Sequence, residues 1–131
     1  MILVDSNVPM YLVGAAHQHK ADSQRLLERA ISERVRLVTD AEVFQEILHR
    51  YTAIQRRDAI QPCFNALLGL VDDVLAIDLP TVEEAKRITL GHPNLSARDA
   101  IRVAATQQHG IEQILTFDAA FDSFPGISRV T

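Results

Sequence analysis

Short strand-like runs alternate with helix-like runs along the whole chain, and this alternation limits the fold more than any other feature. The expected strands cover residues 2–5, 36–39, 74–77, 113–116 and 128–130. The segments between them carry apolar residues at the three- and four-residue intervals typical of helices. Parallel strands need crossover connections, which are usually helices. The pattern therefore predicts an α/β fold with a mostly parallel sheet of about five short strands.

The expected helices fill the intervals between these strands. They cover residues 8–18 and 21–33 as a hairpin, then 40–53, 57–70, 82–90 and 97–109. Gly110 is the expected stop of the last one. Capping boxes are expected where a Ser or Thr precedes an acid by three residues, namely at Ser96 with Asp99, Thr39 with Glu42 and Thr81 with Glu84.

Composition narrows the class of protein. A chain of 131 residues that is 47% hydrophobic and 23% charged suits a single domain spanning residues 1–131. The single cysteine allows no internal disulfide, and the N-terminus lacks the pattern of a secretory signal, so a cytoplasmic protein is expected. Its apolar runs are too short to cross a bilayer. The net charge of -4 argues against binding nucleic acid through the overall field of the protein.

Acidic residues recur near the ends of the expected strands. Asp5 ends the first strand and Asp118 follows the fourth, while Glu46 and Asp99 lie early in two helices. The carboxyl ends of parallel strands share one edge, where open α/β sheets bind their ligands. Carboxylate oxygens are the ligands that Mg²⁺ and Mn²⁺ prefer. We therefore expect these acids to form one metal-dependent site.

Taken singly, most of these acids also have a structural interpretation. Asp99 fits a capping box, Asp118 fits the N-cap of a short helix at 119–121, and Asp5 fits the turn after the first strand. Acids in a first helical turn also gain from the helix dipole. Glu46 lies in a second turn and has no such explanation. The joint placement of all four acids favours a shared site.

The other chemistry-bearing side chains are less informative. Arg50, Arg56 and Arg57 lie close together in the sequence, and Arg98 and Arg102 flank Asp99. Planar guanidinium groups suit phosphate, but a solvated helix face is the favoured interpretation of these arginines. The five histidines and Cys63 show no zinc-ligand spacing, so surface or packing roles are expected for them.

Four segments in order resemble the PIN domain, and most closely the VapC-type ribonuclease toxins of toxin-antitoxin pairs. The segments are residues 3–7, 38–48, 96–100 and 115–121. The resemblance implies a three-layer α/β/α domain. It also implies that the metal-binding and catalytic acids are Asp5, Glu46, Asp99 and Asp118, with Asn7 and Thr116 as polar helpers. Asp122 matches a less regular acidic position of the family.

The same resemblance implies an activity and partners. These are endoribonuclease activity with Mg²⁺ or Mn²⁺, a homodimer, and inhibition by a cognate antitoxin. Two adjacent helices carry apolar side chains that fit either a groove for an antitoxin segment or ordinary core packing. They are Phe44, Leu48, Tyr51, Phe64, Leu67 and Leu68.

Three other functions deserve comparison. A phosphatase with Asp5 as aspartyl nucleophile would need a second Asp where this chain has Asn7. A response-regulator receiver with Asp78 as phosphoacceptor would need paired acids after the first strand and a lysine after the last long strand, and this chain has neither. A non-catalytic PIN-like module that binds RNA or protein stays open, although acids at all four positions disfavour it.

Overall fold

Five short parallel strands form the centre of the computed structural model, which describes residues 1–130. The strands are β1 (Ile2–Val4), β2 (Leu37–Asp40), β3 (Asp73–Leu75), β4 (Gln113–Leu115) and β5 (Ser128–Arg129). Their order is β3-β2-β1-β4-β5, and every neighbouring pair is parallel. The predicted α/β fold with a parallel sheet is confirmed. In this order β1 lies at the centre, so its carboxyl end opens between β2 and β4.

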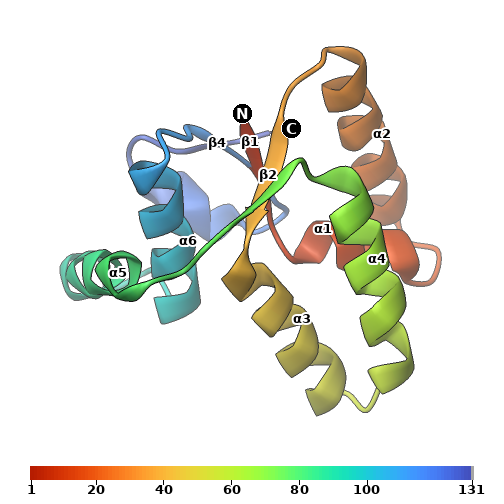
Figure 1. Ribbon diagram of the computed structural model, residues 1–131, viewed down its shortest axis with the longest axis horizontal. Coiled ribbons are helices and arrows are strands. Elements are labelled where there is room, and N and C mark those ends of the chain that lie inside the picture. Colours follow the sequence, from red (N-terminus) through yellow and green to blue (C-terminus); the bar gives the residue numbers. More distant parts are fainter. Residues whose placement is uncertain (131) are drawn as a thin grey trace.

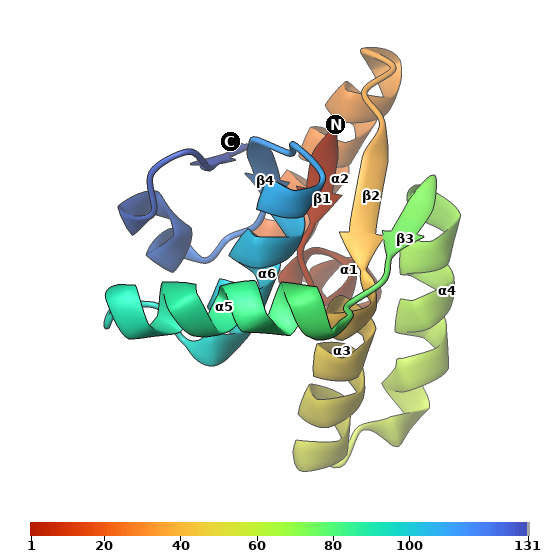
Figure 2. The same cartoon turned by 60° about the vertical axis from the view of Figure 1, so that its left-hand side comes forward.

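Helices cover both faces of the sheet, which makes the three layers (Figures 1 and 2). The helices are α1 (Asn7–Val13), α2 (Gln18–Ser32), α3 (Ala41–Ala53), α4 (Ile60–Leu70), α5 (Leu79–Gly91) and α6 (Ala97–Gln108), with 3-10 turns η1 (Arg57–Ala59) and η2 (Ala119–Ser123). Side chains of β1 alternate between the layers. Ile2 and Val4 pack in the core under α1 to α4, and Leu3 packs in the core under α5 and α6.

Two of the three expected capping boxes are wrong. Aspartates cap α3 and α5 instead: Asp40 Oδ1 accepts from Val43 N at 2.9 Å, and Asp78 Oδ1 accepts from Thr81 N at 3.1 Å. Strand β2 continues through Asp40, which leaves Thr39 inside the sheet with its hydroxyl donating to Val4 O. Asp78 is thus a helix cap. The box at Ser96 is confirmed, because its hydroxyl accepts from Asp99 N at 3.1 Å.

Other helix boundaries in the structure differ from the predicted ones by a few residues. Helix α1 ends at Val13 and α2 begins at Gln18, so the first predicted helix was too long. The helix expected at 57–70 divides into η1 and α4, because Arg57–Ala59 forms a tighter turn. The expected cap at Asp118 is confirmed, since its Oδ1 accepts from Ala120 N at 2.9 Å at the start of η2.

The six apolar side chains on α3 and α4 divide between core and surface. Tyr51 and Leu67 are buried, and the rings of Phe44 and Phe64 pack against each other with centroids 4.9 Å apart. Leu48 and Leu68 remain exposed. Core packing therefore accounts for part of this set, and the groove for an antitoxin segment stays a prediction. No helix in residues 1–130 is both long enough and apolar enough to span a membrane.

Candidate active site

Asp5 lies at the carboxyl end of the central strand and is held by several donors. Its Oδ1 accepts from Ser6 N at 2.8 Å, and its Oδ2 accepts from the Thr116 hydroxyl at 2.8 Å. Its own backbone N–H donates to Leu115 O, which fixes it beside the end of β4. Asp5 is 6% exposed, so the fold fixes the direction of its carboxylate.

Thr116 and Asn7 form the polar support that the family resemblance implied. Asn7 Nδ2 donates to Thr116 Oγ1 at 3.0 Å, and Asn7 Oδ1 accepts from Phe117 N at 3.4 Å. Thr116 Oγ1 also accepts from the backbone N–H of Asp118 at 3.1 Å. One hydroxyl therefore connects Asp5, directly after β1, to the segment that carries Asp118.

A buried arginine that sequence reasoning assigned to a solvated helix face lies beside Asp5. The Arg102 side chain is 1% exposed, and its Nε donates to Asp5 Oδ1 at 3.2 Å. Its Nη1 donates to both oxygens of Asp40 at 2.8 and 2.7 Å, and its Nη2 donates to Glu46 Oε2 at 2.5 Å. The solvated-face interpretation is wrong for Arg102, because three carboxylates, from the residue after β1, from β2 and from α3, converge on it.

Sequence signals for this cluster did exist. Asp40 ends β2 as Asp5 ends the run of β1, so the criterion that selected Asp5 also applied to Asp40. Arg102 stands alone within the otherwise apolar stretch 100–105 of α6. A single charge in a buried helical stripe requires a buried partner of opposite charge.

The cluster shifts the pKa values of its members. Burial lowers the pKa of the Arg102 guanidinium, but Asp5, Asp40 and Glu46 outweigh burial and raise it above its ordinary value. Burial raises the pKa of Glu46, Arg102 lowers it, and the negative charge of Asp5 raises it further. The net direction for Glu46 is upward. Arg102 therefore stays charged and compensates only part of the cost of burying Glu46.

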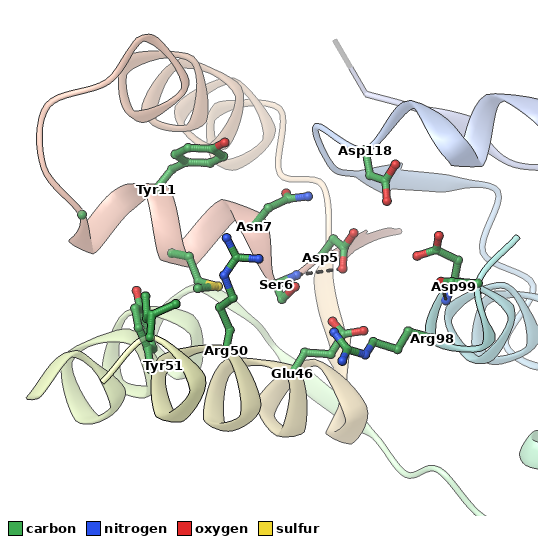
Figure 3. A pocket seen from close by; sticks show the side chains of 14 residues that line it. Asp5, Ser6, Asn7, Tyr11, Glu46, Arg50, Tyr51, Arg98, Asp99 and Asp118 are labelled. Atoms are coloured by element: carbon green, nitrogen blue, oxygen red, sulfur yellow. Dashed lines mark hydrogen bonds between the residues drawn. The ribbon is translucent and has the colours of Figure 1, made fainter. Parts of the chain in front are cut away.

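Asp99 and Asp118 lie on the outer side of the same cleft. Asp99 comes from the first turn of α6, and Asp118 from the loop before η2. Figure 3 shows their carboxylates facing the space in front of Asp5. Burial raises the pKa of Asp99, and the negative charges of Asp118 and Asp5 raise it further. Burial is thus the main cause of the upward shift, and the neighbouring carboxylates add to it.

The cleft between these residues has a volume of about 710 Å³. It brings together the four acids expected at one site, Asp5, Glu46, Asp99 and Asp118. Asn7, Arg50 and Arg98 also line it, as do Tyr11 and Tyr51 (Figure 3). Two of the arginines considered for phosphate therefore line the cleft, whereas Arg56 pairs with Asp58 elsewhere.

Asp122, the acid of the less regular family position, lies in η2 and pairs with Arg129. Arg129 donates from Nε and Nη2 to the two oxygens of Asp122, each at 2.8 Å. The guanidinium lowers the pKa of this exposed carboxyl. Asp122 is not among the residues that line the cleft.

The donor set of the cleft suits a hard divalent cation. Asp5, Asp99 and Asp118 offer carboxylate oxygens, the ligands that Mg²⁺ and Mn²⁺ take in proteins. In the part of the chain that the structure describes, no group of three or more His, Cys, Asp or Glu side chains is arranged to hold a metal ion. The chemistry of the donors fits, although the carboxylates do not stand together as a complete ligand set.

Comparison with known proteins agrees with this architecture. The family model for the PIN domain matches residues 2–127. The chain belongs to the PIN domain family. It is 59% identical over 130 residues to ribonuclease VapC13 of Mycobacterium tuberculosis, and equally to VapC ribonuclease Mb1869c of Mycobacterium bovis, covering 99% of each chain. This PIN domain is therefore of the VapC type.

Solved structures share the fold at low sequence identity. The crystal structure of Mycobacterium tuberculosis VapC20, a toxin that cleaves the sarcin-ricin loop, superposes with a TM-score of 0.79 at 21% identity, covering 97% of this chain and 98% of that one. A toxin-antitoxin complex from Klebsiella pneumoniae gives a TM-score of 0.69 at 17% identity, covering 100% and 97%. The three-layer PIN architecture is thus common to all of them.

Proposed function

We propose that this chain is a metal-dependent endoribonuclease and the toxin of a VapBC-type toxin-antitoxin pair. The observation that carries the proposal is the gathering of Asp5, Glu46, Asp99 and Asp118 on one cleft in a chain 59% identical to VapC ribonucleases. Acids on a cleft at the carboxyl edge of a parallel sheet suit hydrolysis of a phosphodiester, which needs a cation beside its anionic phosphate.

In this proposal Asp5, Asp99 and Asp118 would hold Mg²⁺ or Mn²⁺. The bound ion supplies charge neutralisation at the phosphate and lowers the pKa of a water molecule. Thr116 fixes the direction of the Asp5 carboxylate by donating to Oδ2, and Asn7 orients the Thr116 hydroxyl. No nucleophilic side chain is required for this chemistry.

The cleft also carries side chains suited to the substrate. Arg50 and Arg98 line it beside the acids, and guanidinium groups pair well with the phosphates of RNA. Glu46 faces the same space, where its carboxylate can orient a water molecule through the oxygen that Arg102 does not bind. Phosphate binding thus falls to the arginines and water positioning to Glu46.

Cleavage of mixed RNA in Mn²⁺ or Mg²⁺ tests the proposal. We expect cleavage that stops in EDTA and that Asp5→Asn and Asp99→Asn each reduce by at least about a hundredfold. Asp58→Asn is the matched control, because Asp58 is an exposed acid that pairs with Arg56. Undiminished cleavage in chelator, or in both cleft variants, would favour a non-catalytic PIN-like binding module instead.

We also propose a cognate antitoxin as partner. Leu48, Ile54 and Leu68 are exposed on or just after α3 and on α4, and Ile54 lines the cleft itself. An apolar segment laid over these side chains would cover the entrance to the acids. A co-expressed neighbour should copurify and suppress cleavage, and Leu48→Asp should weaken its retention. Equal cleavage with and without the bound neighbour contradicts this assignment.

A homodimer is proposed on the family resemblance alone. Light scattering on the purified chain should give about twice the mass of one chain. A monomeric mass at micromolar concentration would contradict it.

A further inference from the structure

The buried guanidinium of Arg102 lies between two of the acids assigned to the metal site. Nε donates to Asp5 and Nη2 donates to Glu46. We infer that this guanidinium fills the place of a second divalent ion, so that the cleft binds a single ion, at Asp5, Asp99 and Asp118. The inference rests on the proposed function and specifies the composition of its site.

The fold holds this cation permanently. Arg102 is 1% exposed and donates through Nε, Nη1 and Nη2 to carboxylates from three different elements. Asp40, which is fully buried, accepts from Nη1 with both oxygens and also caps α3. A guanidinium fixed by a bidentate pair keeps its charge and its direction.

Several of the oxygens that a second ion would need already accept hydrogen bonds. A carboxylate offers roughly four lone-pair positions. Those of Asp5 accept from Ser6 N, from Arg102 Nε and from the Thr116 hydroxyl. The remaining position is enough for one ion. Glu46 Oε2 accepts from Arg102 Nη2, so an ion bridging Asp5 and Glu46 would lie directly beside the guanidinium.

Charge points to the same arrangement. A divalent ion placed beside the guanidinium would meet a fixed positive charge at short range. On the outer side of the cleft the opposite holds, because within residues 1–130 neither Asp99 nor Asp118 forms a salt bridge. The single ion therefore belongs at the outer side, with Asp5 as the shared ligand.

Counting bound Mn²⁺ per chain tests this inference without reference to cleavage. Free Mn²⁺ is followed by its electron paramagnetic resonance signal during titration of the purified chain. The decisive variant is Asp40→Asn with Arg102→Met, which removes one charge of each sign and retains similar volumes. Asp40→Asn alone is the matched control, since it keeps the guanidinium and an amide oxygen that can cap α3.

We expect one Mn²⁺ for the wild-type chain and for Asp40→Asn, and two for the double variant, in which Asp5 Oδ1 and Glu46 Oε2 lose their guanidinium donors. Two ions on the wild-type chain would overturn the inference, as would one ion on a folded double variant. A wild-type chain that binds no Mn²⁺ and leaves RNA intact overturns the proposed function itself. A chain that cleaves RNA with two bound ions overturns only this inference.

If the double variant does not fold, a comparison of single acids replaces it. Glu46→Gln should leave the dissociation constant for Mn²⁺ within about tenfold of wild type, whereas Asp118→Asn should raise it by more than about tenfold, because only Asp118 is a ligand. An equal loss of Mn²⁺ affinity in the two variants would place Glu46 among the ligands and overturn the inference.

Discussion

The acidic edge of the sheet divides into an inner and an outer half, which differ in how the negative charge of their carboxylates is compensated. The inner half consists of Asp5, Asp40 and Glu46, which surround the buried Arg102. The outer half consists of Asp99 and Asp118, which face the cleft and form no salt bridge within residues 1–130. Charge in the inner half is compensated by a cation of the fold, whereas the outer half is where we propose that a cation from solution binds.

Removal of the inner cation is the most damaging change. Arg102→Met leaves the buried carboxylate of Asp40 without its cationic partner, which should lower the free energy of unfolding by about 3–5 kcal/mol. Urea denaturation in EDTA measures this loss. Arg129→Met, which breaks the exposed pair with Asp122, should change stability little. Similar losses in the two variants would mean that the buried cluster has no special structural role.

Addition of an ion to the outer half should stabilise the fold. Mn²⁺ at about a hundred times its dissociation constant should raise the free energy of unfolding by ~2.7 kcal/mol. Asp118→Asn should reduce this gain, while its amide oxygen can still cap η2 by accepting from Ala120 N. Thermal melts with Mn²⁺ and with EDTA decide the matter. A melting temperature indifferent to Mn²⁺ contradicts an ion site in the outer half.

Thr116 connects the two halves, so its hydroxyl should affect both. Thr116→Val removes a buried hydrogen bond to Asp5 and should cost about 1.5–3 kcal/mol of stability, with weaker Mn²⁺ binding. Thr106→Val is the control, because the Thr106 hydroxyl is also buried but donates to Val103 O within its own helix. That control should leave Mn²⁺ affinity unchanged. Weaker Mn²⁺ binding in both variants would indicate a general effect of lost packing.

Replacement of either of two glutamates in α3 should change stability little, but the two variants should differ strongly in cleavage. Glu46→Gln should remove nearly all cleavage, because Glu46 lines the cleft and is bound by Arg102. Glu42 lies one turn earlier, in the first turn of α3 and outside the cleft lining. Glu42→Gln should cost only ~0.3–1 kcal/mol through the helix dipole and leave cleavage intact. If Glu42→Gln is the inactive variant, the second acid of the site must be reassigned.

The sequence by itself determined the order of strands and helices in this protein. Hydrophobic periodicity is local, so it revealed the alternation of strands and helices and placed Asp5 at the end of a buried strand. Ser96 was identified as a cap because its partner is the backbone of Asp99, three residues away. Glu46, Asp99 and Asp118 were expected in the same site because each lies at a fixed place relative to a strand or helix that the sequence pattern predicts.

Tertiary structure alone decided how the charges of the site are compensated. Arg102 contacts Asp5, Asp40 and Glu46 across separations of 97, 62 and 56 residues. A local pattern therefore could not distinguish Arg102 from an arginine on a solvated face. The continuation of β2 through Asp40 made that residue both the cap of α3 and the partner of Arg102. A charge becomes buried only when distant elements close around it, so its role follows from packing.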